Sequence, residues 1–302
     1  EKGWRRRGPY GGFLGKRYDP LFTQCKPRFA REPKVKYYDP VLPEGEPFLP
    51  GAESLDAMPN LRLSRRRSLL EQLDALSSQM EGSPSVTTMN DSMSRAFAMM
   101  TTGRVRAAFD LSREPAKARA AYGTSLTGAC LLTARRLVEA EVPFISVHQE
   151  IFDHYGHSYD MHENNFGMLK ESNLPMLDQV VPALLGDLER RGLLNSTLVI
   201  VMGEMGRSPR VNGKAGRDHW PQCGFSLLFG GGAQEGLVHG SSDRIGAWPS
   251  THPVTPPDLV ATFYHLMGID PAMTVPDRNG RPVAIAHGGE PVRALVASSV
   301  GS

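Results

Sequence analysis

Two patterns of apolar residues alternate along this chain. Helical spacing predicts helices at residues 64–80, 87–101 and 126–140, a pair between Glu163 and Gly192 that breaks near Pro175, and one from Thr255 to Gly268. Short continuous apolar runs predict strands buried on both faces at residues 142–148, 197–203 and 225–229. Strands that alternate with helices in this way indicate an α/β fold, in which helices cover both faces of a mainly parallel sheet.

The beginning of the chain follows neither pattern. Residues 1–60 are rich in Pro, Gly and Tyr, so we expect an irregular segment packed on the main domain, which residues 61–302 form in major part. Near the other end, Asn279-Gly280 predicts a hairpin turn followed by a short helix. Because the chain begins with Glu in loop-like sequence, we also expect an N-terminal portion to be missing.

Composition narrows the functional classes. The formal net charge of +2 favours neither nucleic acid nor an acidic surface as the partner, and no segment has the apolar length of a membrane span. The three cysteines are scattered and include no CxxC pair, so they specify neither a disulfide framework nor a zinc site.

Charged residues gather after two of the predicted strands. The strand at 197–203 delivers Glu204 to a sheet edge, and the loop that follows carries Arg207, Arg210, Asp218 and His219. The carboxyl ends of strands are where open α/β sheets bind ligands. The passage 148–162, after the first strand, is the most titratable in the chain and offers two pairs of metal ligands: Asp153 with His157, and Asp160 with His162.

We therefore expect one divalent metal site where the two loops meet, with Asp160, His162, Asp218 and His219 as its ligands and Glu204 beside it. Oxygen and imidazole ligands together favour zinc or manganese over calcium, which remains open. Asp153 and His157 are the reserve pair. The alternative is that Asp218 and His219 only hold their loop in place.

Several stretches resemble known families. Residues 194–206 are similar to the sulfatase strand in which a Thr-Leu-Val-Ile run precedes Ser-Asp-His/Asn-Gly, and residues 253–269 resemble a sulfatase helix that ends in a Leu-x-Gly turn. Residues 160–166, 203–210 and 216–221 together resemble the exported bacterial proteins grouped as domain of unknown function 1501. The chain is identified as a member of that family, which is regarded as sulfatase-like within the alkaline phosphatase superfamily.

This resemblance implies a metal-dependent hydrolase of phosphate or sulfate esters. Its substrate would be a small anionic ester or a sulfated or phosphorylated glycan, with Glu204, Arg207 and Arg210 as the catalytic residues. Family members usually start with a twin-arginine export signal, which implies a periplasmic or extracellular location. The rival is a non-catalytic exported protein that keeps the fold and binds glycans or partner proteins.

Two departures from the pattern bear on this choice. Glu204-Met205 stands where metal-dependent phosphatases have Asp-His, so a second metal would lose a histidine ligand. The N-terminal strand that carries a metal-binding Asp and the nucleophile in alkaline-phosphatase-like enzymes has no counterpart in these residues.

Overall fold

The structure, a computed structural model, describes residues 10–14, 18–35, 37–50, 103–149, 159–277 and 279–298. The predicted helices at 64–80 and 87–101 lie outside these residues. Within them, no helix is long and apolar enough to cross a membrane.

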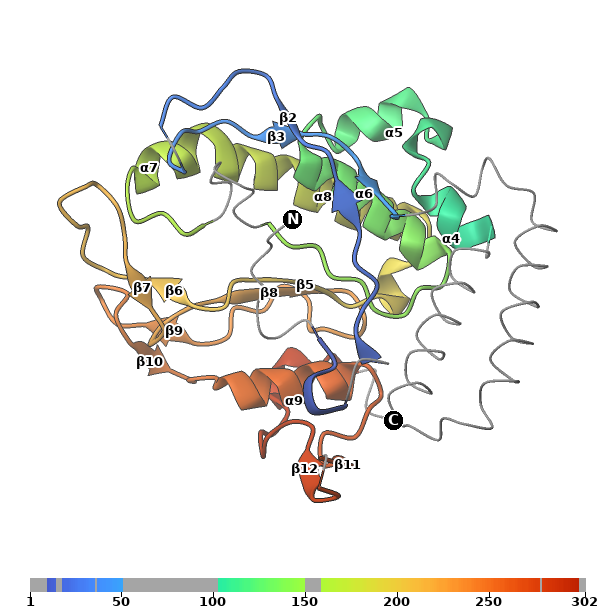
Figure 1. Ribbon diagram of the computed structural model, residues 1–302. Coiled ribbons are helices and arrows are strands. Elements are labelled where there is room, and N and C mark those ends of the chain that lie inside the picture. Colours follow the sequence, from blue (N-terminus) through green and yellow to red (C-terminus); the bar gives the residue numbers. More distant parts are fainter. Residues whose placement is uncertain are drawn as a thin grey trace, which may run out of the picture.

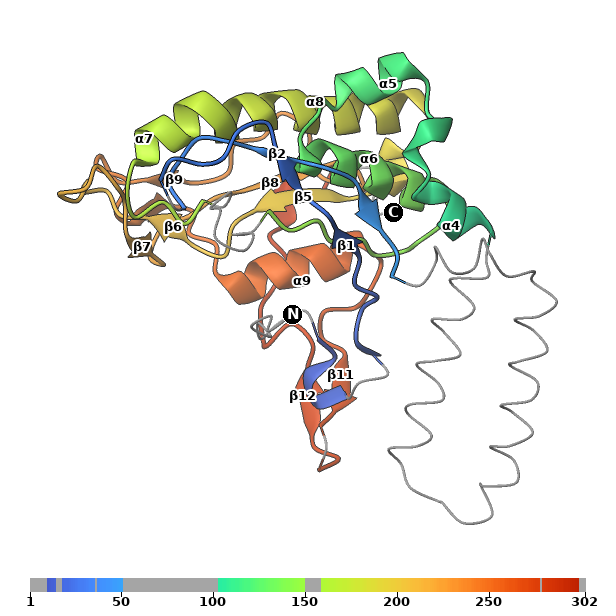
Figure 2. The same ribbon diagram turned by 45° about the horizontal axis from the view of Figure 1, so that its top comes forward.

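Helices lie on both sides of a central strand pair (Figures 1 and 2). The pair consists of β5 (Val199–Met202) and β8 (Ser226–Phe229). On one side are α6 (Leu126–Glu139) and α8 (Leu174–Arg190), and on the other is α9 (Pro256–Leu266). The best-buried apolar cluster sits between α6 and α8 and includes Leu132, Leu184 and Leu188, with Val199 of β5 packed against it.

The remaining elements are short. The helical ones are η1 (Gly12–Leu14), α4 (Gly103–Ala108), η3 (Leu111–Arg113), α5 (Ala116–Ala121), α7 (Asn165–Met168), the π-helical η4 (Leu169–Asn173), η5 (Leu194–Ser196) and η6 (Arg293–Leu295). The strands are β1 (Gln24–Cys25), β2 (Arg28–Phe29), β3 (Pro43–Glu44), β4 (Pro47–Phe48), β6 (Gly206–Arg207), β7 (His219–Trp220), β9 (Ser241–Ser242), β10 (Pro249–Thr251), β11 (Thr274–Pro276) and β12 (Pro282–Ala284).

The helices at 126–140 and after Thr255 are confirmed. The Ser125 hydroxyl accepts a hydrogen bond from Gly128 N at 3.1 Å and so caps α6. Thr255 and Asp258 form a reciprocal capping box at the start of α9. Two α-helices, α7 and α8, follow Glu163 as predicted, and α8 begins just before Pro175, which lies in its first turn. No loop separates them, because the π-helical η4 joins α7 to α8.

The strands predicted at 197–203 and 225–229 do lie in one sheet, but they do not pair in the parallel direction that a mainly parallel sheet favours. β5 and β8 are antiparallel, with Val199 opposite Phe229 and Met202 opposite Ser226. Parallel neighbours need a crossover connection, usually a helix, whereas the chain between these strands holds only the short pair β6–β7. Every strand pair among the described residues is antiparallel, and the alkaline-phosphatase-like fold stays a prediction.

The strand predicted at 142–148 is also absent. Residues 144–149 run beside β5 in the same direction but form no strand (Figures 1 and 2). Pro143 brings no N–H to a ladder, and Phe144 is 76% exposed, so this segment gains neither the hydrogen bonds nor the burial that hold a strand.

The hairpin predicted around Asn279-Gly280 is confirmed by the pairing of β11 with β12, and η6 follows it.

The N-terminal segment lies against the helical layer. β1 pairs with β4, and β2 with β3, while Val41 and Leu49 are buried. Glu44 forms a backbone bridge with Ser125, the cap of α6. The segment therefore contacts the fold where α6 begins.

A buried arginine joins the elements of this helical layer. The side chain of Arg135, on α6, is 0% exposed. Its nitrogens lie 2.6 Å from Glu114 Oε2 and 2.9 Å from Asp187 Oδ2, on α8. Tyr122 donates a hydrogen bond to Asp187 at 3.2 Å. Arg135 thus links two carboxylates from different elements, and the less buried Arg136 and Arg191 complete the network.

Replacing Arg135 with Met should lower the free energy of unfolding by about 1.5–3 kcal/mol, because Glu114 and Asp187 lose their fully buried partner and keep only the less buried Arg136 and Arg191. Urea denaturation followed by circular dichroism measures this loss. Arg119→Gln on α5, where the arginine is exposed, is the control and should change stability by less than about 0.5 kcal/mol. Equal effects of the two substitutions would contradict the role given to Arg135.

The same cluster predicts acid sensitivity. Burial raises the pKa values of Glu114 and Asp187, but the neighbouring arginines lower them more, so both lie below their ordinary values of 4.5 and 3.8. A carboxyl with a lowered pKa stabilises the fold above its ordinary pKa, and this stability is lost as the pH falls through the lowered value. Stability measured from pH 7 to pH 3 should therefore drop below about pH 4.5, and less steeply in Asp187→Asn. An unchanged slope in that variant would contradict the prediction.

Candidate metal centre

The residues of the candidate site come from two loops. Asp160 and His162 lie just before α7, and His219 begins β7. β7 pairs antiparallel with β6, which sets Arg207 directly opposite His219. One short strand pair thus positions a histidine and an arginine side by side.

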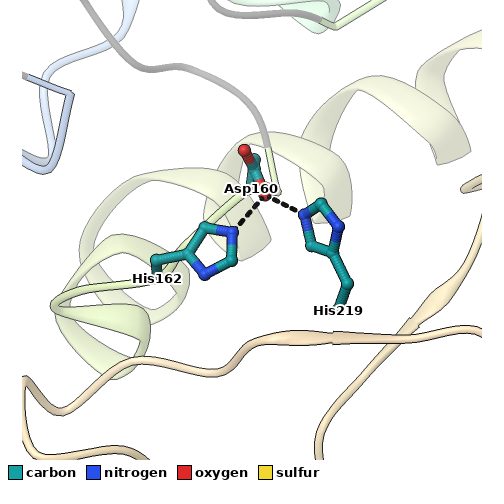
Figure 3. A group of neighbouring side chains, drawn as sticks. All are labelled: Asp160, His162 and His219. Atoms are coloured by element: carbon teal, nitrogen blue, oxygen red, sulfur yellow. Dashed lines mark hydrogen bonds and ion pairs between the residues drawn. The ribbon is translucent and has the colours of Figure 1, made fainter.

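Three side chains converge on one point (Figure 3). Asp160 Oδ1 lies 2.8 Å from His219 Nε2 and 3.1 Å from His162 Nε2. Their candidate ligand atoms all lie within 4.8 Å of one another. The structure therefore brings together three of the four residues predicted as ligands, and metal binding by them stays a prediction.

Backbone hydrogen bonds hold the two loops together. Asn164 N and Asn165 N donate to the carbonyls of Lys214 and Ala215, and Arg217 N donates to Met161 O. Gly216 is required at this junction, because a Cβ there would overlap the carbonyl oxygen of His162. The alignment of His162 with His219 therefore rests on main-chain contacts.

Asp218 lies behind His162 and outside the group of three. Its Oδ1 is 2.8 Å from His162 Nδ1 and accepts a hydrogen bond from Asn212 Nδ2 at 3.3 Å. A carboxylate only accepts hydrogen bonds, so His162 Nδ1 carries a proton and Nε2 faces Asp160. Metal-binding histidines are commonly held in this way by a carboxylate on the other ring nitrogen. The structure thus gives Asp218 a positioning contact rather than a place among the ligand atoms.

Arg207 adds a positive charge to the group. Its Nη2 donates to Asp160 Oδ1 at 2.8 Å. Partial burial raises the pKa of Asp160, but hydrogen bonds from His219 and Arg207 lower it more, and the net pKa lies below its ordinary value. The hydrogen bond with His162 lowers the pKa of Asp218. Both carboxylates are therefore ionised at neutral pH.

The other predicted site residues lie elsewhere. Glu204 is exposed and is not one of the three grouped residues. Arg210 is exposed and lines an open hollow of about 340 Å³ together with Asn212 and Asp218. The reserve pair, Asp153 and His157, lies outside the described residues. Sequence reasoning missed Asn212, although Asn212-Gly213 is a recognisable turn signal.

The donor set fits a transition metal. Two imidazole nitrogens and one carboxylate oxygen suit zinc or manganese, whereas calcium prefers oxygen alone. Ligand atoms around tetrahedral zinc lie about 3.3 Å apart, given bond lengths of about 2.0 Å. The two Asp160–histidine distances of 2.8 and 3.1 Å would need to lengthen by only a few tenths of an ångström.

The fold and the site together define a protein with helices on both sides of an antiparallel strand pair and with two histidines and one carboxylate grouped between two loops. Residues 2–296 match the family described as protein of unknown function (DUF1501). The chain belongs to this family. No curated protein and no solved structure matches it.

Gly216→Ala should separate the two loops. Because the added Cβ would overlap His162 O, the amides of Asn164 and Asn165 should lose their partners and exchange hydrogen faster. Amide hydrogen exchange measures this directly, and we expect a stability loss of about 1–3 kcal/mol. Gly213→Ala is the matched control, since nothing lies within 4 Å of a Cβ at that position. Unchanged exchange in Gly216→Ala would rule out this junction.

Proposed function

We propose that this chain is a metal-dependent hydrolase of phosphate or sulfate esters. The observation that supports it is the group formed by Asp160, His162 and His219, with Asp218 behind His162. Two histidines and one carboxylate leave further coordination positions for water or substrate, as in catalytic rather than structural zinc sites. Zinc or manganese is the metal that this donor set favours.

The substrate class follows from the charges around the group. Arg207 contacts the group and Arg210 lines the adjoining hollow, so both are available to neutralise an anionic ester. The resemblance of residues 194–206 to a sulfatase strand supports a sulfatase-like enzyme. A small anionic ester or a sulfated or phosphorylated glycan is the substrate we propose, in the periplasm or outside the cell.

Each residue has a definable task in this proposal. Asp160, His162 and His219 would hold the metal, which when bound polarises a non-bridging ester oxygen and activates a nucleophile. Asp218 keeps His162 Nε2 turned toward Asp160. Arg207 and Arg210 bind the anionic group of the ester. Glu204, exposed after the end of β5, is retained only as a candidate acid or base.

A second function, binding without catalysis, is favoured by one observation. Ser208 is a hydroxyl residue next to the group, yet its Oγ donates to Arg210 O at 2.7 Å and accepts from Asp218 N at 3.1 Å. Its hydroxyl is therefore engaged in holding the loop. In this alternative the chain uses the same metal group to bind a glycan or a partner protein.

Metal titration followed by calorimetry tests the proposal. The full chain should bind one Zn²⁺ or Mn²⁺ ion. His219→Ala should abolish detectable binding because it removes a ligand, and Asp218→Asn should weaken it about 10–100-fold because it frees the ring of His162. His265→Ala on α9 is the control and should bind like the unaltered chain.

Turnover separates the two functions. The strand that carries the nucleophile in alkaline-phosphatase-like enzymes has no counterpart in these residues. Hydrolysis of aryl phosphate or aryl sulfate by the metal-loaded chain, lost in His219→Ala, would therefore show that the nucleophile is already present in the chain and would support the hydrolase. Metal binding without turnover of either ester would favour the non-catalytic function. A chain that binds neither metal would refute both.

A further inference from the structure

Asp160 Oδ1 is the oxygen that three nitrogens of the group approach. His162 Nε2, His219 Nε2 and Arg207 Nη2 lie 3.1, 2.8 and 2.8 Å from this one oxygen. A metal held by Asp160 and both histidines would turn the two histidine nitrogens away from this oxygen and would place a second cation next to Arg207. Repulsion between the two cations would weaken the Arg207–Asp160 hydrogen bond.

The charges of the group also indicate that metal binding favours anion binding. Asp160 and Asp218 contribute −2 and Arg207 contributes +1, so the group carries −1 when the histidines are neutral. A divalent ion would raise this sum to +1. The ion therefore makes the group more attractive to anions by two charges. The neighbouring pair Lys214–Glu163 is neutral and leaves this sum unchanged.

This inference rests on the proposed function. We propose that Arg207 is the anion-binding residue of this site: when metal binds, its guanidinium leaves Asp160 and binds the sulfate or phosphate oxygens of the substrate. Metal and anion then bind cooperatively. The metal frees Arg207 from Asp160, and the anion compensates the positive charge that the metal adds.

The surroundings of Arg207 permit this transfer. Its side chain is only 17% exposed, so it remains next to the group whether it binds Asp160 or an anion. Its Nη1 is 3.5 Å from Arg217 O, a weak contact that is easily given up. A guanidinium binds two oxygens of a tetrahedral anion through parallel hydrogen bonds, which a single contact with Asp160 Oδ1 does not use. Arg210, by contrast, is exposed and lines the open hollow.

Calorimetry with Mn²⁺ and inorganic sulfate tests the coupling. Mn²⁺ is titrated into the full chain with and without sodium sulfate, at ionic strength held constant with sodium chloride. Sulfate should tighten Mn²⁺ binding by about fivefold or more, and Mn²⁺ should tighten sulfate binding by the same factor. Arg207→Gln should abolish the coupling, and it should bind Mn²⁺ alone as tightly as the unaltered chain or more tightly, because the competing cation is gone.

Two further variants sharpen the test. Arg207→Lys keeps the charge without the planar fork, so it should retain part of the coupling. Arg119→Gln on α5 removes one positive charge away from the group and should retain all of it.

The outcomes distinguish this inference from the proposed function. Coupling in the unaltered chain that Arg207→Gln abolishes supports the inference. Mn²⁺ binding that sulfate does not change, coupling that survives in Arg207→Gln, or Mn²⁺ binding that this variant weakens would overturn the inference and leave the proposed metal site intact. A chain that binds neither Mn²⁺ nor Zn²⁺ would overturn the proposed function itself.

Discussion

The buried ion pairs of Arg135 are the constraint on which the helical layer depends. One guanidinium on α6 faces Glu114, which follows η3, and Asp187 on α8, and Arg136 and Arg191 complete the network. This arrangement fixes α8 against α6. α8 continues the helical run that starts at α7, directly after the loop that carries Asp160 and His162. By fixing α8, the ion pairs therefore help to position the loop before α7 that carries Asp160 and His162.

The second half of the site reaches the first by main-chain contacts. The loop after β6 docks on the residues before α7 through the carbonyls of Lys214 and Ala215 and through Gly216, which leaves no room for a side chain. The pairing of β6 with β7 then turns His219 and Arg207 to the same place. Asp160 is 38% exposed and His219 49% exposed, so solvent screens their mutual attraction. Backbone geometry, more than charge, keeps the group assembled.

Much of the local structure could be predicted from the sequence, and much of the pairing could not. Helix caps such as Ser125 and Thr255 act within a few residues, so the pattern locates α6 and α9. Strand direction depends on the connection between strands, and the polar stretch after β5 returns the chain without a helix, which apolar runs alone do not reveal. The meeting of Asp160, His162 and His219 followed from two loops that carry matching residue types. The contact of Asp218 with the far nitrogen of His162 did not, because spacing says nothing about ring orientation.

The position of Arg207 links the two halves of the functional argument. If the site only holds its loops in place, it needs no further ligand, since Asp160 already has Arg207 and both histidines as partners. A site meant for metal and anion is complete only after this set is rearranged, with the histidine lone pairs turned to the metal and the guanidinium turned to the anion. The two interpretations therefore differ in how Arg207, whose side chain is 17% exposed, responds when a divalent ion binds. If the group served only structure, removing Arg207 would loosen Asp160 and weaken any metal bound there. If the group serves ligand binding, removing Arg207 removes a cation that competes with the metal for Asp160. Whether metal affinity falls or rises in this variant therefore distinguishes the two interpretations.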